Sequence, residues 1–350
     1  MKTKILIIIC VVALAACKKK GTETEPTPDP APGAKNYYAV GSDLNTTTGV
    51  SVIKYWKNGV VTNLTDGTKS AFPNSIAITN TEVLIAGVEH NGTNFIAKLW
   101  RNGVATTLSS TGRISSPNKI FTSGNDVYVT FTEKNTSDIS VIKLWKNGII
   151  TSISDETKNT LLKGLYVNGN DVYITYAEYV PSHNTYSAKL WKNGTVTNLT
   201  SGLYDATTVG VTVIGTDVYV AIRDSEPGPY PKIRLWKNGS FTDLTDGTVI
   251  ATANDIAALG NDIYIIGQQS IATTTSVGKI WKNGIATTLT DVNKINYLNS
   301  VAASGTDVYI GGYERIGTTT NYIAKTWLNG QETKLSEGNS DCRIMGVFIK

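Results

Sequence analysis

Seven copies of one phrase run through the chain, and this repetition constrains the fold more than any other feature of the sequence. The stretch "AKLWKNGTVTNLT", residues 188–200, is one copy, and every tryptophan of the chain occupies the same place in its own copy. The spacings between successive tryptophans are 44, 45, 46, 45, 45 and 46 residues. These tryptophans are Trp56, Trp100, Trp145, Trp191, Trp236, Trp281 and Trp327. A fixed period of this length predicts a repeat architecture.

Two turn signals in each copy predict four short strands per repeat. Asn-Gly stands two residues after each tryptophan, and this pair tolerates the positive φ angles of a tight hairpin. In the third copy an earlier turn, residues 124–126, separates two apolar and β-branched runs. We therefore expect strands near 118–123, 126–132, 140–146 and 149–154 in this copy, named a, b, c and d below. No segment of the sequence shows helical periodicity.

Seven such repeats predict an all-β fold: a seven-bladed β-propeller with four antiparallel strands per blade. The repeats begin with "NYYAVG", which aligns with strand b, and end with "CRIMGVFIK", which aligns with strand a. The closing blade is therefore expected to combine N-terminal strands b, c and d with C-terminal strand a, which removes open sheet edges. We expect strand a to be innermost because its positions are small and apolar. A ring with strand c innermost is the alternative.

The repeated phrase resembles a known family of repeats. Its tryptophan-x-Asn-Gly core, with a leucine a few residues later and an "NDVYVAG"-like segment further on, is similar to the HAF-type extracellular repeats of bacteria. The similarity covers residues 36–350, although the "TDGT" segment occurs only at residues 65–68 and 245–248. The resemblance implies a propeller outside the cytoplasm and implies no particular activity.

The first 35 residues predict export followed by a spacer. Residues 1–16 combine a basic start with an apolar run too short for a bilayer, which needs about 20 residues, so they are interpreted as a signal peptide. The stretch Leu14-Ala15-Ala16-Cys17 resembles a bacterial lipobox, which implies that Cys17 becomes the lipidated N-terminus. Residues 17–35 then form an extended, proline-rich tether. An ordinary secretion signal with an incidental cysteine is the alternative.

The lipobox resemblance also implies a location and a membrane partner. Lys18 follows the cysteine where an aspartate would signal retention in the inner membrane, which implies a lipid anchor in the outer membrane. Whether the propeller faces the periplasm or the cell surface stays open. Removing the six basic and three acidic residues before Asn36 leaves 26 and 25, so no nucleic-acid footprint survives. We expect a monomer.

The sequence shows no constellation for metal binding or catalysis. Cys10 leaves with the signal peptide and Cys17 is lipidated, so Cys342 has no cysteine partner for a disulfide or a thiolate metal site. The two histidines, His90 and His183, lie in separate repeats. We therefore expect no metal, no cofactor and no catalytic triad. A pair of carboxylates for glycoside hydrolysis stays open, because acids from different blades can converge.

Charged residues recur with the repeat. A base precedes each tryptophan by two residues, and an acid stands at the end of strand b in six copies, with Gln269 as the exception. The bases are Lys54, Lys98, Lys143, Lys189, Arg234, Lys279 and Lys325, and the acids are Asp43, Glu89, Glu133, Glu178, Asp224 and Glu314. We expect cross-strand pairs within blades, worth about 0.2–1 kcal/mol each, with Lys143 paired to Glu133. A ligand-binding ring of acids is the alternative, and the tryptophans are expected to pack between blades.

The binding surface is expected where the repeats differ. In an antiparallel blade the b–c and d–a loops emerge on one face, here called the variable face, and the tight a–b and c–d turns emerge on the other. Three unusual loops, residues 178–186, 201–206 and 223–231, converge on the variable face at blades four and five. The predicted ligand-binding residues are Tyr179, His183, Tyr186, Tyr204, Asp205, Arg223 and Tyr230. Rigid loops that only pack on one another are the alternative.

Three functions stay open at this point. A binding or scaffold module for a glycan or a protein partner is favoured, because a rigid disc on a tether suits capture and no acid–base constellation is visible. An enzyme, a hydrolase or lyase acting on an extracellular polymer through non-repeating loops, is the first alternative. A purely structural envelope protein is the second.

Overall fold

The computed structural model describes residues 35–109, 112–272, 275–317 and 321–350. The predicted signal peptide, Cys17 and almost all of the predicted tether lie outside these residues, so those predictions stay untested. The described residues form strands and turns, and none of them forms a helix long and apolar enough to cross a membrane. The prediction of an all-β chain is confirmed.

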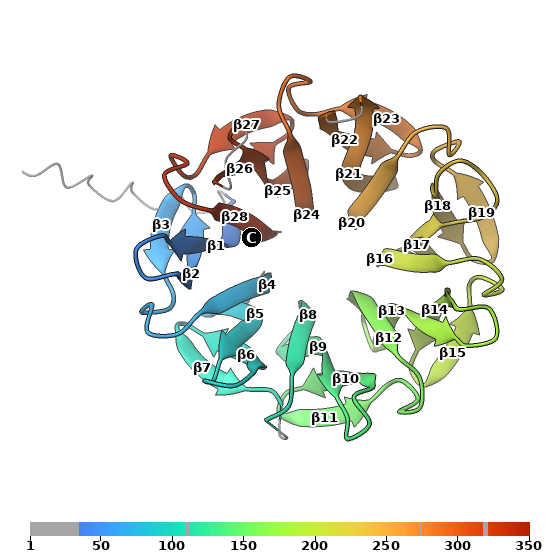
Figure 1. Ribbon diagram of the computed structural model, residues 1–350, viewed down its shortest axis with the longest axis horizontal. Coiled ribbons are helices and arrows are strands. Elements are labelled where there is room, and N and C mark those ends of the chain that lie inside the picture. Colours follow the sequence, from blue (N-terminus) through green and yellow to red (C-terminus); the bar gives the residue numbers. More distant parts are fainter. Residues whose placement is uncertain (1–34, 110–111, 273–274, 318–320) are drawn as a thin grey trace, which may run out of the picture.

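Twenty-eight strands form seven four-stranded antiparallel sheets arranged as blades around a central axis (Figure 1). The innermost strands, from blade one to blade seven, are β28 (Cys342–Ile349), β4 (Ala71–Ile78), β8 (Ser115–Ser123), β12 (Thr160–Asn168), β16 (Ala206–Ile214), β20 (Ala251–Leu259) and β24 (Asn296–Ser304). The second strands are β1 (Tyr37–Asn45), β5 (Val83–His90), β9 (Asp126–Lys134), β13 (Asp171–Val180), β17 (Asp217–Asp224), β21 (Asp262–Ala272) and β25 (Asp307–Arg315). The third strands are β2 (Val50–Lys57), β6 (Phe95–Arg101), β10 (Ser140–Lys146), β14 (Thr185–Lys192), β18 (Lys232–Lys237), β22 (Thr275–Lys282) and β26 (Tyr322–Leu328). The outer strands are β3 (Val60–Asn63), β7 (Val104–Thr107), β11 (Ile149–Ser152), β15 (Thr195–Asn198), β19 (Ser240–Asp243), β23 (Ile285–Thr288) and β27 (Gln331–Lys334).

The ring closes through blade one, as the repeat phase predicts. Its sheet runs β28-β1-β2-β3, so the C-terminal strand is the innermost strand of a blade whose other strands are N-terminal. Asn36 and Lys350 extend this pairing, because each backbone N–H donates to the carbonyl of the other, at 2.6 and 2.9 Å. Figure 1 shows the C-terminus beside the central axis, with strand a innermost in every blade.

The Asn-Gly turns adopt the backbone that the sequence predicts. The asparagine of every c–d hairpin has a positive φ, from 45° at Asn238 to 51° at Asn283. Each of these side chains also accepts a hydrogen bond from the start of strand b in its own blade, as Asn193 Oδ1 does from the Val172 N–H at 2.9 Å. The asparagine therefore shapes one hairpin and fastens it to the neighbouring turn.

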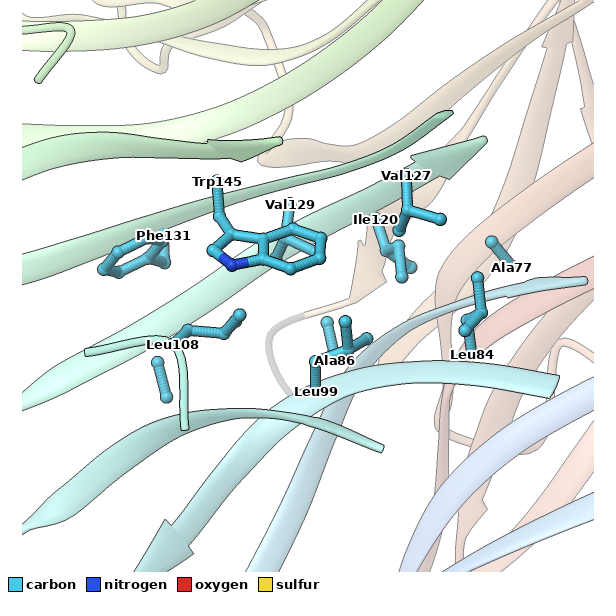
Figure 2. Packing of buried hydrophobic residues seen from close by; sticks show 11 residues of the cluster. Ala77, Leu84, Ala86, Leu99, Leu108, Ile120, Val127, Val129, Phe131 and Trp145 are labelled. Atoms are coloured by element: carbon cyan, nitrogen blue, oxygen red, sulfur yellow. The ribbon is translucent and has the colours of Figure 1, made fainter. Parts of the chain in front are cut away.

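The hydrophobic core lies between adjacent blades. Six of the seven tryptophans are buried, and Trp191 is partly buried against the cluster between blades three and four. Trp145 of blade three packs on Leu99 and Leu108 of blade two (Figure 2). The prediction that the tryptophans pack between blades is confirmed.

A β-bulge, which the repeat pattern does not predict, interrupts the innermost strand of every blade at the same place. In blade two, for example, Pro73 pairs with Gly87 and Ser75 pairs with Ala86, which leaves Asn74 as the extra residue. The extra residues are Asn74, Asn118, Lys163, Val209, Asn254, Asn299 and Met345. A bulge bends its strand and redirects the side chains beside it. The seven bulges form a layer across the channel, called the bulge layer below.

The described chain begins on the face with the tight turns. Lys35 Nζ donates to the Asp307 carboxylate at 2.6 Å and to the Ser304 carbonyl at 2.9 Å, beside the a–b turn of blade seven. The Lys35 ammonium and the Asn329 and Tyr37 side chains lower the pKa of the Asp307 carboxyl to about 2. The entry of the chain at this turn leaves the variable face on the opposite side of the disc.

Candidate functional site

The repeated charges form pairs within blades, as expected, in five of the seven copies. The base of strand c reaches the acid of strand b at 2.5 Å for Lys54 and Asp43 and at 2.8 Å for Lys189 and Glu178. The other pairs are Lys98 with Glu89 at 3.8 Å, Arg234 with Asp224 at 2.9 Å, and Lys325 with Glu314. Lys279, whose blade carries Gln269, donates instead to the Thr288 hydroxyl at 2.8 Å. These charges hold strands together and do not form one ring.

The predicted pairing of Lys143 with Glu133 is wrong. Lys143 turns toward the outer strand, where it donates to the Ser152 hydroxyl at 2.6 Å and to the Glu156 carboxylate at 3.1 Å. The Glu133 carboxylate accepts a short hydrogen bond from the Ser109 hydroxyl. Ser152 lies directly across from Lys143 in the β10–β11 pairing, so two acceptors are available on that side.

Four of the seven predicted ligand-binding residues lie together, where blades four and five meet. The Tyr179 and Tyr186 rings lie 5.5 Å apart between centroids, with their planes tilted by 60°. Asp205 joins the two blades, because its carboxylate accepts the Tyr186 N–H at 3.0 Å and lies 3.7 Å from the Arg223 guanidinium. We call this cluster, with the exposed Tyr204 beside it, the four–five sector.

The other two predicted residues stand at the margins of this sector. His183 is exposed at the tip of its loop, with Nδ1 2.9 Å from the Ser182 hydroxyl. Tyr230 is also exposed, and its backbone N–H donates to the Gly247 carbonyl at 3.1 Å, in the connection that leads to blade six. The 223–231 loop thus contacts the connection between blades four and five near its start and the connection between blades five and six near its end.

A groove on the variable face was missed by the sequence analysis. It has a volume of about 580 Å³ and runs between blades one and two toward the channel. Two phenylalanines from blade two, Phe72 and Phe95, present half-exposed rings in it, at 5.7 Å and edge to face. Arg343, Asp341 and Asn74 also line it, with several serine hydroxyls. We call this feature the aromatic groove.

The Arg343 guanidinium lines one side of the aromatic groove and is held by contacts with neighbouring side chains. Arg343 donates two hydrogen bonds to the Asp341 carboxylate, at 2.6 and 2.7 Å, and its guanidinium carbon lies 4.2 Å from the centroid of the Tyr322 ring. Tyr322 packs edge to face on Tyr313, which stacks on Tyr297 at 4.9 Å. Burial raises the pKa of the Tyr313 hydroxyl above its ordinary value. This support orders Arg343 before any ligand arrives.

A signal for this groove exists in the sequence. Phe72, Tyr297 and Arg343 each stand two residues before the bulge in strand a, where blades three, five and six carry Ser116, Thr207 and Thr252. Blade four carries Leu161 at this position, so the aromatic and cationic side chains are confined to blades one, two and seven. The signal can be recognised only once the bulges give the register of strand a, because the register decides which positions of different blades are equivalent.

The charged groups near the aromatic groove are paired with one another. Among the described residues no group of three or more histidine, cysteine, aspartate or glutamate side chains is placed to hold a metal ion. The carboxylate that lines the aromatic groove, Asp341, is paired with Arg343. A larger hollow of about 820 Å³ lies beside Asp43 and Asp66 in blade one, but its lining residues include no aromatic side chain.

Comparison with known proteins supports the fold and gives no family. No family model and no curated protein matches the chain, so the resemblance to HAF-type repeats stays a prediction. A puromycin-hydrolyzing peptidase of Mycobacterium tuberculosis is similar, with 10% identity, a TM-score of 0.59, and coverage of 87% of this chain and 52% of the peptidase. The chain thus spans about half the length of that peptidase. An acylaminoacyl peptidase of Pyrococcus horikoshii gives 12% identity, a TM-score of 0.54, and coverage of 87% and 51%.

One similar structure differs in how its ring closes. The β-propeller domain of the Trilobed protease of Pyrococcus furiosus is 9% identical, with a TM-score of 0.54 and coverage of 87% of this chain and 93% of that domain. That domain is described as having an open velcro topology, whereas β28 and β1 pair in this chain and close the ring. At these identities the likeness shows the propeller fold alone.

Proposed function

We propose that this propeller is a binding module, held at the outer membrane by a lipid on Cys17, which captures a glycan on its variable face. The observation that carries the proposal is the aromatic groove, where two half-exposed phenylalanine rings lie beside an ordered Arg343–Asp341 pair. Aromatic rings pack on the apolar C–H faces of sugars, while guanidinium, carboxylate and amide groups exchange hydrogen bonds with hydroxyls. A protein partner is the alternative ligand.

The place where the described chain begins supports this orientation. Lys35 is fastened beside the a–b turn of blade seven, on the face with the tight turns. A tether that joins the disc on that face leaves the variable face directed away from the anchor. The aromatic groove and the four–five sector both lie on the variable face, so one extended polymer can contact both.

The four–five sector is the second contact surface of this proposal. Tyr204 and Tyr230 are 44% and 40% exposed, so their rings are available to a ligand. Arg223 and Asp205 supply polar groups between the two blades. Prolines at 181, 227, 229 and 231 stiffen the two b–c loops, which lowers the entropy lost when a ligand orders them.

The test is a glycan array probed with the full chain in detergent, followed by titration of the best glycan. The double variant Phe72→Ala/Phe95→Ala is expected to weaken binding about tenfold or more, since buried aromatic contacts dominate binding energies. The triple variant Tyr179→Ala/Tyr204→Ala/Tyr230→Ala tests the second surface. The matched control is Ile149→Ala/Ile285→Ala, two exposed apolar side chains on outer strands of blades three and six.

The outcomes separate the alternatives. A loss of binding in the phenylalanine variant alone places the main contact in the aromatic groove, and a loss in the tyrosine variant alone places it in the four–five sector. If no glycan is retained while a defined envelope protein is captured in a variant-sensitive way, the ligand is a protein. Equal affinity in all three folded variants contradicts both proposed surfaces.

A further inference from the structure

The bulge layer contains one departure from the repeat that the proposed glycan surface does not use. The residue directly after the bulge is serine or glycine in five blades: Ser75, Gly164, Gly210, Ser300 and Gly346. Blade three has Lys119 at this position and blade six has Asp255. Two opposite charges thus replace small residues at equivalent places in the ring.

These two charges meet across the channel. Lys119 Nζ lies 2.9 Å from Asp255 Oδ2, although blades three and six are not neighbours in the ring. The Asp255 carboxylate is buried and also accepts the backbone N–H groups of Ile256 and Val301, both at 3.1 Å. The Lys119 side chain is 26% exposed and lines a pocket in the channel.

Stability alone is a weak reason for such a pair. Removing two charges from water costs as much as or more than their attraction returns, and apolar replacements of a buried ion pair are often neutral or stabilising. The other five blades show that serine or glycine satisfies the fold at this position. A charge pair that the fold does not need points to a ligand.

A pocket adjoins the pair on the side of the tight turns. Its volume is about 340 Å³, within the size range of small-molecule sites. One aliphatic side chain from each blade lines it: Ile76, Ile120, Leu165, Val211, Ile256, Val301 and Val347. Phe121, Tyr166 and Phe348 line it as well, with the Lys119–Asp255 pair at the bulge layer. The pocket therefore has walls that combine apolar side chains with the Thr122 and Thr212 hydroxyls, and a charged end.

The hydrogen-bonding capacity of the pair identifies the ligand class. An ammonium has three N–H donors, and among the described residues Lys119 Nζ donates to Asp255. The Asp255 carboxylate already accepts three hydrogen bonds, from Lys119 and from two backbone N–H groups. Elsewhere in the same ring Lys325 binds two carboxylates at once, those of Glu314 and Glu332. We propose that the channel pocket binds a small monocarboxylate with an apolar body, whose carboxylate takes a second place on Lys119.

The probes are hexanoate and 1-hexanol, which share an apolar body and differ in charge. Each is titrated into the full chain in detergent-solubilised form by calorimetry, with detergent blanks subtracted. The charge-assisted hydrogen bond to Lys119 is expected to make hexanoate bind about tenfold or more tightly than 1-hexanol. Equal affinity of the two probes, or no saturable binding of hexanoate, overturns the proposal.

Two variants separate a ligand role from a structural one. Lys119→Met is expected to weaken hexanoate binding about tenfold, whereas Asp255→Asn removes a repelling charge and is expected to strengthen it. Both changes break the same ion pair. If the pair has only a structural role, the hexanoate affinity changes in the same direction in both variants. That result would contradict the proposal. Lys146→Met is the matched control, because it breaks the exposed Lys146–Asp126 pair of blade three, at 2.8 Å, outside the pocket.

Discussion

At the scale of single residues, each Asn-Gly hairpin depends on its asparagine for two separate reasons. Asn193 has a φ of 47°, which costs an alanine about 1–2 kcal/mol. Its side chain also accepts the Val172 N–H and donates to the Asp171 carboxylate at 2.7 Å. The two roles can be separated by substitution, because a glycine tolerates the positive φ angle but has no side chain to form the hydrogen bonds.

We therefore expect Asn193→Gly to lower the free energy of unfolding by about 1–2 kcal/mol, through the lost hydrogen bonds. Asn193→Ala is expected to cost about 1 kcal/mol more, because it adds the backbone strain. Urea unfolding of both variants measures the difference. Asn198→Ala, at an exposed position of β15 in the same blade, is the control. An alanine variant as stable as the glycine variant would show that the positive φ carries no cost here.

Cys342 offers a second test at this scale. Its side chain is buried in blade one, and burial, with the nearby Asp43 carboxylate, raises the pKa of its thiol to about 12. The thiolate is the reactive form, so alkylation near pH 8 is expected to be at least about a hundredfold slower in the folded protein than in urea. Mass spectrometry after iodoacetamide treatment measures this, with Cys342→Ser as the control. Rapid labelling in native buffer would mean that β28 detaches from the ring.

At the scale of elements, the repeats made strands and turns predictable and left the bulges hidden. The alternation of apolar residues and the Asn-Gly pairs act locally, so the four strands of each blade follow from the sequence. A bulge depends on how two strands pair. In β8, Pro117 and Lys119 pair with consecutive residues of β9, and nothing in the sequence of β8 marks Asn118 as the extra residue. The wrong pairing of Lys143 has the same origin, because its choice between Ser152 and Glu133 depends on side-chain direction and not on spacing.

The closing strand β28 gives a sharp test of the ring. Deleting residues 344–350 removes the buried side chains of Ile344, Val347 and Ile349 and most of the pairing with β1. Each buried aliphatic side chain contributes about 1.5–3 kcal/mol, so the loss approaches the whole stability of a typical domain. Thermal unfolding is expected to become non-cooperative or to shift down by more than about 10 °C. Deletion of Lys350 alone is the control, and a truncated chain that melts like it would contradict the closed ring.

At the scale of the whole molecule, the candidate sites are made by residues that the sequence separates widely. Lys119 and Asp255 are 136 positions apart, and the groove combines Phe72 of blade two with Arg343 near the C-terminus. Their proximity requires seven blades, a closed ring and the bulge register together. The four–five sector was predictable in part, because its loops belong to consecutive blades and Asp205 lies in the connection between them.

The proposed lipid anchor on Cys17 predicts where the whole propeller is held in the cell envelope. Lipid chains contribute about 0.8 kcal/mol per buried methylene, and one chain alone gives only reversible binding, so multiple acylation of Cys17 is what would hold the protein. If the proposed tether between Cys17 and Lys35 is extended, at about 3.1 Å per residue, it would place the disc about 50 Å from the membrane.

Wild-type protein is therefore expected in the outer-membrane fraction, with an acylated Cys17 at its N-terminus in intact-mass spectra. Cys17→Ser is expected to remove the acyl mass and abolish membrane retention, while the propeller unfolds at the same temperature, because the anchor contributes nothing to the ring. Lys18→Asp is the matched variant, since it keeps the acylation site and is expected to shift the protein to the inner membrane. Retention of unacylated Cys17→Ser in the outer membrane would show that the disc itself binds there and that the lipid is not the anchor.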